Sequence, residues 1–255
     1  MDLEKKIRSI HDLLQKKKFL KVKEELEKLL KIIPNNSYLL NLSGLTLQYL
    51  DDYKSAINFF TLAIKNDEKN IAAMNNLANS YKNLSNYTEA EKIYKKILNI
   101  DHNYVHALNN YANLKIEIND HGEAIPLLEK AILISNQRNI KAIDIMLTLA
   151  SVYQSINNLE KTREILDEIF SIKPKWSKAH KLLSEITKYS SNDPKSLSHI
   201  EEMKKIMSDK ELKDDDKLIL SFALGKSLED LKKYDQSFDY LQTANDLKKS
   251  LIISN

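Results

Sequence analysis

Two hexapeptides in this chain are nearly identical and stand 34 residues apart: MNNLAN at residues 74–79 and LNNYAN at residues 108–113. The pattern around them returns along most of the 255-residue chain. Aligned units begin at Leu3, Ser37, Ile71, Val105, Ile143, Ser177 and Leu218. The two longer spacings, 38 residues before Ile143 and 41 before Leu218, locate insertions and make the sixth unit degenerate. A fixed period of this length indicates a repeat architecture.

Small and large residues alternate at fixed places of the unit. The eighth place is mostly small, and it holds Ile10, Gly44, Ala78, Ala112, Ala150, Ser184 and Gly225. The twentieth place of the clearest units holds Ala56, Ala90, Ala124 and Ser237, and the twenty-seventh holds Ala63, Ala131 and Ala244. A large apolar residue fills the twenty-fourth place, as Phe60, Tyr94, Leu128, Leu166 and Leu241. This alternation predicts two helices that approach closely in each unit.

Turn residues and composition favour helices throughout. The chain has only 3 Gly and 4 Pro, far fewer than sandwiches, barrels and doubly wound sheets need at their turns. Pro34 and Pro174 end their units, where a helix cannot continue. The turns within hairpins are filled by Asp51-Asp52, Asn119-Asp120 and Asn157-Asn158, whose side chains can cap the second helix. The fold class predicted is therefore all-α.

The small residues at places 8, 20 and 27, with a bulky residue at place 24, resemble the tetratricopeptide repeat (TPR). This resemblance implies a right-handed α-solenoid of about seven helical hairpins, formed by residues 3–255 as one domain. Lys115 and Thr187 depart from the family at place 11, where it carries an apolar residue. We expect that departure to alter local packing without changing the fold.

Composition and motifs argue against several function classes. The net charge of +3 is too small to indicate nucleic-acid binding, and no apolar run is long enough for a membrane span. We therefore predict a cytoplasmic protein with no nucleic-acid or membrane partner. The chain lacks Cys and glycine-rich phosphate loops, and Asn103 stands between His102 and His106 where a zinc-protease motif needs Glu. We identify no catalytic, cofactor-binding or metal-binding residue and predict that this chain is not an enzyme.

Polar residues on one face of the first helices are the candidate site. Asn75, Asn79 and Lys82 lie about 120° round the helix from the core stripe, and the next unit repeats this arrangement. In TPR proteins this stripe lines a concave groove. Similar Asn ladders occur in O-linked N-acetylglucosamine transferases, which the two hexapeptides resemble. The predicted groove residues are Asn41, Gln48, Asn75, Asn79, Lys82, His106, Asn109, Asn113, Lys178 and Lys181.

Asn amides carry both donors and an acceptor, so this ladder could hold the backbone of an extended peptide or a partner protein without demanding a sequence. The alternative is that Asn is merely frequent and solvates an exposed face. Lys178 and Lys181 could favour an acidic partner, or they could form an ordinary solvated lysine face. Similarly, the single Trp176 could contact the groove, but packing between hairpins is the favoured interpretation.

The last unit resembles one particular group of proteins. Its string SFALGK at residues 221–226, with Ser237-Phe238 and Ala244-Asn245 after it, is similar to the repeats that precede the catalytic domain of bacterial TPR-sulfotransferases. Those enzymes use 3′-phosphoadenosine 5′-phosphosulfate. The resemblance implies, as an alternative function, a non-catalytic region that recruits the substrate of such an enzyme, with residues 246–255 as a possible start of a linker. A third possibility is an oligomerising scaffold.

Overall fold

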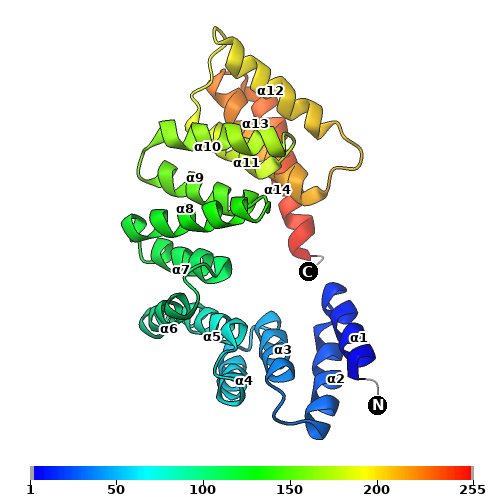
Figure 1. Cartoon of the computed structure of the whole chain (residues 1–255). Helices are drawn as coiled ribbons and strands as arrows, with labels where there is room; N and C mark the ends of the chain where they lie inside the picture. Colours follow the sequence, from blue (N-terminus) through cyan, green and yellow to red (C-terminus); the bar gives the residue numbers. More distant parts are fainter. Residues whose placement is uncertain (1–2, 254–255) are drawn as a thin grey trace. The chain divides into compact units, whose positions relative to one another are not determined.

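The computed structural model describes residues 3–253, and every regular element in that range is an α-helix (Figure 1). The helices fall into two compact units, one ending at Ile140 and one beginning at Lys141. Unit one contains α1 (Leu3–Gln15), α2 (Phe19–Ile32), α3 (Ser37–Tyr49), α4 (Tyr53–Asn66), α5 (Ile71–Asn83), α6 (Tyr87–Ile100), α7 (Val105–Glu117) and α8 (His121–Gln137). Unit two contains α9 (Ile143–Ser155), α10 (Leu159–Ile172), α11 (Ser177–Ile186), α12 (Pro194–Met207), α13 (Asp214–Asp230) and α14 (Tyr234–Ile253).

Both units are stacks of antiparallel helix pairs, as expected for an α-solenoid built from repeats. Six helices begin at the residues where repeat units begin in the sequence, and α13 begins at Asp214, four residues before Leu218. The sixth repeat is irregular, because α11 has only ten residues and packs chiefly against α13. None of the helices in residues 3–253 is both long enough and apolar enough to cross a lipid bilayer.

The turns within the hairpins follow one local rule. The first turn residue has a left-handed backbone, with φ of 58° at Asp51, 60° at Asn119 and 59° at Asn157. Asn and Asp tolerate this conformation better than most residues with a side chain. The following residues, Asp52, Asp120 and Asn158, accept a hydrogen bond from a backbone N–H in the first turn of the next helix. The capping prediction is therefore confirmed.

The small and large residues of each hairpin meet as predicted. Gly44 of α3 lies against the ring of Phe60 from α4, and a Cβ atom at Gly44 would be 2.5 Å from that ring. Gly225 of α13 lies in the same way against Leu241 of α14, 2.6 Å from where its Cβ would be. Larger residues at these eighth places would force the paired helices apart.

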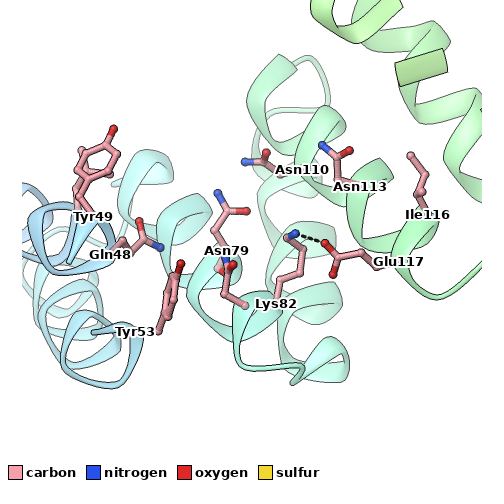
Figure 2. Close-up of a pocket in the computed structure, with 11 residues that line it drawn as sticks. Gln48, Tyr49, Tyr53, Asn79, Lys82, Asn110, Asn113, Ile116 and Glu117 are labelled. Carbon is pink, nitrogen blue, oxygen red and sulfur yellow. Dashed lines mark hydrogen bonds and ion pairs between the residues drawn. The ribbon is translucent and has the colours of Figure 1, made fainter. Parts of the chain in front are cut away.

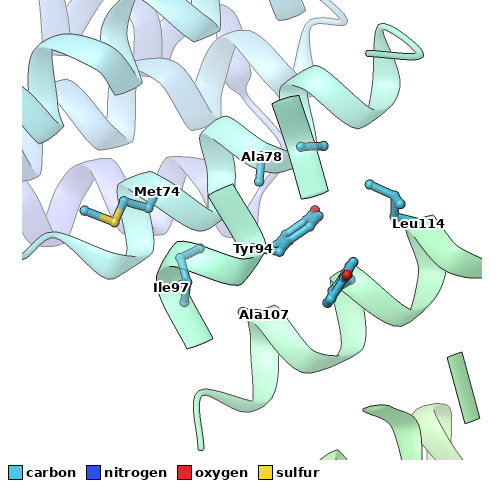
Figure 3. Close-up of a cluster of buried hydrophobic side chains, with 8 residues drawn as sticks. Met74, Ala78, Tyr94, Ile97, Ala107 and Leu114 are labelled. Atoms are coloured by element: carbon cyan, nitrogen blue, oxygen red, sulfur yellow. The ribbon is translucent and has the colours of Figure 1, made fainter. Parts of the chain in front are cut away.

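The centre of unit one is built from α5, α6 and α7 (Figure 3). Tyr94 of α6 is fully buried beside Ala78 of α5 and Ala107 of α7. Its ring stacks on Tyr111 of α7 with a centroid separation of 5.8 Å. Alanines at these places leave room for the two tyrosine rings, which bury large areas and join consecutive repeats.

Lys115 occupies the eleventh place of its repeat, where the family carries an apolar residue. Its side chain is buried, and its Nζ lies 2.8 Å from Glu123, 3.2 Å from Glu91 and 3.5 Å from Asp120. Burial opposes the charged form, but hydrogen bonds to Glu123 and Glu91 hold the pKa of Lys115 above its ordinary value. The lysine therefore joins α7 to its neighbours as a paired cation.

Unit two contains a buried hydrogen-bonded chain of four groups. The carbonyl of Pro174 accepts from Nε2 of His180 at 2.7 Å, which fixes the tautomer of that ring. Nδ1 of His180 then accepts from Nε2 of His199 at 3.0 Å, and Nδ1 of His199 accepts from the Tyr189 hydroxyl at 2.6 Å. In this arrangement both histidines are neutral. Burial accordingly lowers the pKa of His180, and burial beside His180 lowers the pKa of His199 to about 4.

Trp176 is 7% exposed, and its backbone forms the N-cap of α11. This burial agrees with a packing role.

The last stretch assigned to a possible linker, residues 246–255, continues α14 as far as Ile253. Its final two residues lie outside the described residues.

Candidate functional site

A cavity of about 530 Å³ lies along the first helices of three successive hairpins in unit one, α3, α5 and α7 (Figure 2). Its lining repeats with the period of the sequence, because it comes mainly from places 9, 12 and 13 of each unit. The lining residues are Leu45, Gln48, Tyr49, Tyr53, Asn79, Lys82, Asn83, Asn110, Asn113, Ile116 and Glu117. Places 9, 12 and 13 share one side of a helix, so stacking the repeats aligns them in a row.

Asn79 is held by the core behind it. The Tyr94 hydroxyl donates to Oδ1 of Asn79 at 2.6 Å. That bond occupies the amide oxygen and leaves the two Nδ2 protons for the cavity. Burial raises the pKa of Tyr94, so its hydroxyl remains a donor at any ordinary pH. Asn79 therefore presents hydrogen-bond donors in a fixed orientation.

Gln48 is also held in place, but through its amide donors and not through its oxygen. Its Nε2 donates to the carbonyl oxygen of Asn76 at 2.9 Å and to Oγ of Ser80 at 2.8 Å. These bonds tie α3 to α5 and use both amide protons. Gln48 therefore offers its Oε1 to the cavity as an acceptor.

A second row of asparagines joins consecutive repeats. Asn76 donates from Nδ2 to Oδ1 of Asn41 at 3.0 Å, and Asn110 donates in the same way to Asn75 at 3.1 Å. Each bond spans 35 residues, one residue more than the repeat. Asn41 and Asn75 are buried. This bond uses one Nδ2 proton of Asn110 and leaves its Oδ1 as a further acceptor in the lining.

Charged and aromatic side chains complete the lining. Nζ of Lys82 on α5 pairs with Oε1 of Glu117 on α7, the interaction dashed in Figure 2. Tyr49 is exposed on one side and stacks on Phe19 of α2 with a centroid separation of 4.7 Å. The charges within this cavity are therefore balanced, and Tyr49 adds an apolar surface.

The structure brings four of the predicted groove residues together, namely Gln48, Asn79, Lys82 and Asn113. Asn41 and Asn75 instead bond neighbouring repeats, while His106 is exposed and Asn109 half-buried outside the lining. Lys178 and Lys181 line a different cavity in unit two.

Several lining residues were missed by the sequence analysis, among them Tyr49, Asn83 and Glu117. They share the thirteenth place of their units, one residue after the twelfth-place residues Gln48 and Lys82. Extending the polar stripe by that one place would have found all three. In contrast, no regular spacing indicated Tyr53, which begins α4.

Among residues 3–253, no group of three or more His, Asp or Glu side chains is arranged to hold a metal ion.

Three family models, each described as a tetratricopeptide repeat, match residues 37–70, 70–137 and 116–186. Residues 37–186 are tetratricopeptide repeats. No functionally curated protein matches the sequence.

Several solved structures are similar over most of the chain. A TPR protein from Parabacteroides merdae has 18% identity and a TM-score of 0.66, with 96% of this chain and 92% of that chain covered. PilW, a type IV pilus biogenesis factor, has 20% identity and a TM-score of 0.63, with coverages of 84% and 98%. YrrB, described as a TPR protein with an unusual peptide-binding site, has 14% identity and a TM-score of 0.54, with coverages of 72% and 93%. At these identities the likeness shows the fold alone.

Proposed function

We propose that this TPR chain is a non-catalytic scaffold whose α3–α5–α7 cavity binds an extended peptide segment of a partner protein. The observation that carries the proposal is the fixed orientation of its amides. Asn79 presents donors, while Gln48 and Asn110 present acceptors. An extended peptide backbone likewise presents alternating N–H and C=O groups, so it can bond to this set whatever its side chains are.

The amides are already held in place before a ligand arrives. Tyr94, Ser80 and Asn75 occupy the inner atoms of Asn79, Gln48 and Asn110, and those inner bonds persist when a ligand binds outside. Little side-chain entropy is then lost on binding, which favours affinity. The side chain of Asn113 lines the cavity and makes no hydrogen bond to another described residue, so it can turn either its donors or its acceptor to a ligand.

Two fold relatives give the proposal a context. YrrB is described by its peptide-binding site and PilW as a pilus biogenesis factor, and both roles belong to those proteins. A protein or peptide partner is the corresponding proposal for this chain. A cytoplasmic location and the lack of nucleic-acid or membrane partners remain predictions from composition.

The proposal can be tested by selecting peptides from a randomised displayed library against the full chain. Selected peptides should bind an Asn79→Ala, Asn113→Ala double variant about 10-fold more weakly, since each lost hydrogen bond contributes about 0.5–1.5 kcal/mol. The matched control is Asn66→Ala, which changes the same residue type at an exposed position of α4 outside the cavity. Equal affinity of the double variant and the wild type would overturn the proposal.

The sulfotransferase alternative depends only on the resemblance of residues 221–245. The structure gives two of the residues that carry it a packing role, because Gly225 lies against Leu241 and the Ser237 hydroxyl donates to the Gly225 carbonyl at 2.8 Å. These identities are therefore explained by the hairpin itself. A native polypeptide much heavier than 29.5 kDa that carries a sulfotransferase domain would revive this alternative.

A further inference from the structure

Unit two contains a second cavity, of about 470 Å³, whose lining differs in chemistry from the first. Its apolar residues come from α9, α11 and α13 and comprise Leu147, Leu182, Leu218, Ile219 and Phe222. All of these except Leu182 are only half-buried. A half-buried apolar surface inside a cavity favours a ligand that covers it with an apolar group.

The polar part of this lining is mostly cationic. Lys178 and Lys181 stand on α11, and Lys248 stands on α14. The one carboxylate in the lining, Glu185, lies 3.1 Å from Nζ of Lys181. Lys178 and Lys248 form no ion pair with a described residue, in contrast to Lys82 of unit one, which Glu117 neutralises. Two uncompensated cations from two different helices therefore border the apolar surface.

We propose that this cavity binds an acidic peptide segment of a partner protein, with one apolar side chain placed between carboxylates. The apolar side chain covers Leu218 and Phe222, and the carboxylates on either side pair with Lys178 and Lys248. A purely acidic segment would leave the apolar surface in water, and a purely apolar one would desolvate the lysines without compensation. A fatty acid has a single carboxylate at its end and cannot place a carboxylate on each side of its apolar chain.

This proposal concerns a separate cavity and does not depend on the groove of unit one. The test uses fluorescence anisotropy with the labelled heptapeptide EDDFEDD and the full chain. Three matched probes separate the contributions: EDDSEDD lacks the apolar side chain, QNNFQNN lacks the charges, and decanoate is added as a competitor. The expected result is saturable binding of EDDFEDD that weakens with added salt, together with at least 5-fold weaker binding of the first two probes.

The decisive variants keep the number of removed charges equal. Lys178→Gln, Lys248→Gln should weaken EDDFEDD binding about 5- to 10-fold. The control Lys195→Gln, Lys210→Gln changes two exposed lysines outside the cavity and should leave the affinity for EDDFEDD unchanged. Unchanged urea midpoints, followed by the fluorescence of Trp176, would show that unit two of each variant remains folded.

If both lysine double variants lost the same affinity for EDDFEDD, the effect would be one of net charge alone, and the proposal would be overturned. Absent binding, equal affinity for EDDSEDD or QNNFQNN, or displacement by micromolar decanoate would overturn it as well. Asn79→Ala, Asn113→Ala should leave intact the salt-sensitive binding of EDDFEDD that depends on Lys178 and Lys248, so failure of one groove is distinguishable from failure of the other.

Discussion

Acidification from pH 7.5 to pH 5.0 should destabilise unit two through its buried histidine pair. His199 accepts from Tyr189 and donates to His180, an arrangement that needs a neutral ring. Its pKa in the folded chain is about 4, because burial beside His180 lowers it from its ordinary value of 6.5. In the unfolded chain it therefore takes up a proton below pH 6.5, whereas the folded chain resists protonation until about pH 4. The stabilisation is thus fully present above pH 6.5 and falls as the pH is lowered.

The two pKa values of His199 correspond to a loss of about 2 kcal/mol between pH 7.5 and pH 5.0 by proton linkage. His180 adds to the loss in the same direction, because burial lowers its pKa too. Carboxylates contribute little in this window. The pKa of Glu91, for example, is held at about 2 by its hydrogen bond to Lys95, in spite of partial burial, and by further bonds from Tyr111 and Lys115.

Trp176 makes the measurement specific to unit two. It is the only Trp of the chain, it is buried, and it stands four residues before His180. Urea denaturation followed by its fluorescence should give a free energy of unfolding about 2 kcal/mol smaller at pH 5.0 than at pH 7.5. His199→Gln cannot titrate, so it should be less stable at pH 7.5 but should lose much less on acidification. The control His106→Gln, at an exposed position of unit one, should behave as the wild type.

A His199→Gln variant that kept the whole acid-induced loss would refute this reasoning. The same conclusion would follow if the wild type were equally stable at both pH values. Either result would mean that the hydrogen-bonded chain from Pro174 to Tyr189 is not coupled to the stability of unit two.

Three further substitutions test the packing and the site by urea denaturation, followed by circular dichroism at 222 nm. Gly44→Ala should lower the free energy of unfolding by about 1 kcal/mol, because overpacking against Phe60 costs about 1–3 kcal/mol and the higher helix propensity of Ala offsets about 1 kcal/mol. A variant more stable than the wild type would contradict the close approach of Gly44 and Phe60. Lys115→Ala should cost about 2–4 kcal/mol at pH 7, since it removes a buried side chain together with the cation that pairs with Glu91 and Glu123. That cost should shrink as the pH falls from 4.5 towards 2, and a constant cost would mean that only packing was lost. Tyr94→Phe should cost about 1 kcal/mol by releasing the Asn79 amide, and selected peptides should bind it more weakly.

Local rules explain why so much of the fold was predictable from the sequence. The pair Gly44 and Phe60 and the turn at Asp51-Asp52 depend on neighbours within one hairpin, so their pattern shows in the sequence. The residues after Ile186 were not predictable in the same way, because the insertion there interrupts the period. As a result, α11 is short and packs on α13, which begins 28 residues after α11 ends.

The candidate site was predictable only in part, for a related reason. A helical wheel places Asn75 and Asn79 on the same polar stripe, but it cannot show what the next repeat presents to them. Asn75 is buried and accepts from Asn110, 35 residues away, whereas Asn79 lines the cavity and accepts from Tyr94 behind it. Contacts between repeats, together with contacts inside a hairpin, therefore decide which asparagines are free to bind a ligand.

The most direct test of the proposed peptide-binding groove is an NMR titration of the side-chain amides. The full chain, labelled with ¹⁵N at asparagine, would be titrated with a peptide selected from the displayed library. The side-chain NH₂ signals of Asn79 and Asn113 should shift as the peptide saturates, while that of the exposed Asn66 on α4 should not. Saturation with no shift at Asn79 or Asn113 would contradict peptide binding in the α3–α5–α7 cavity.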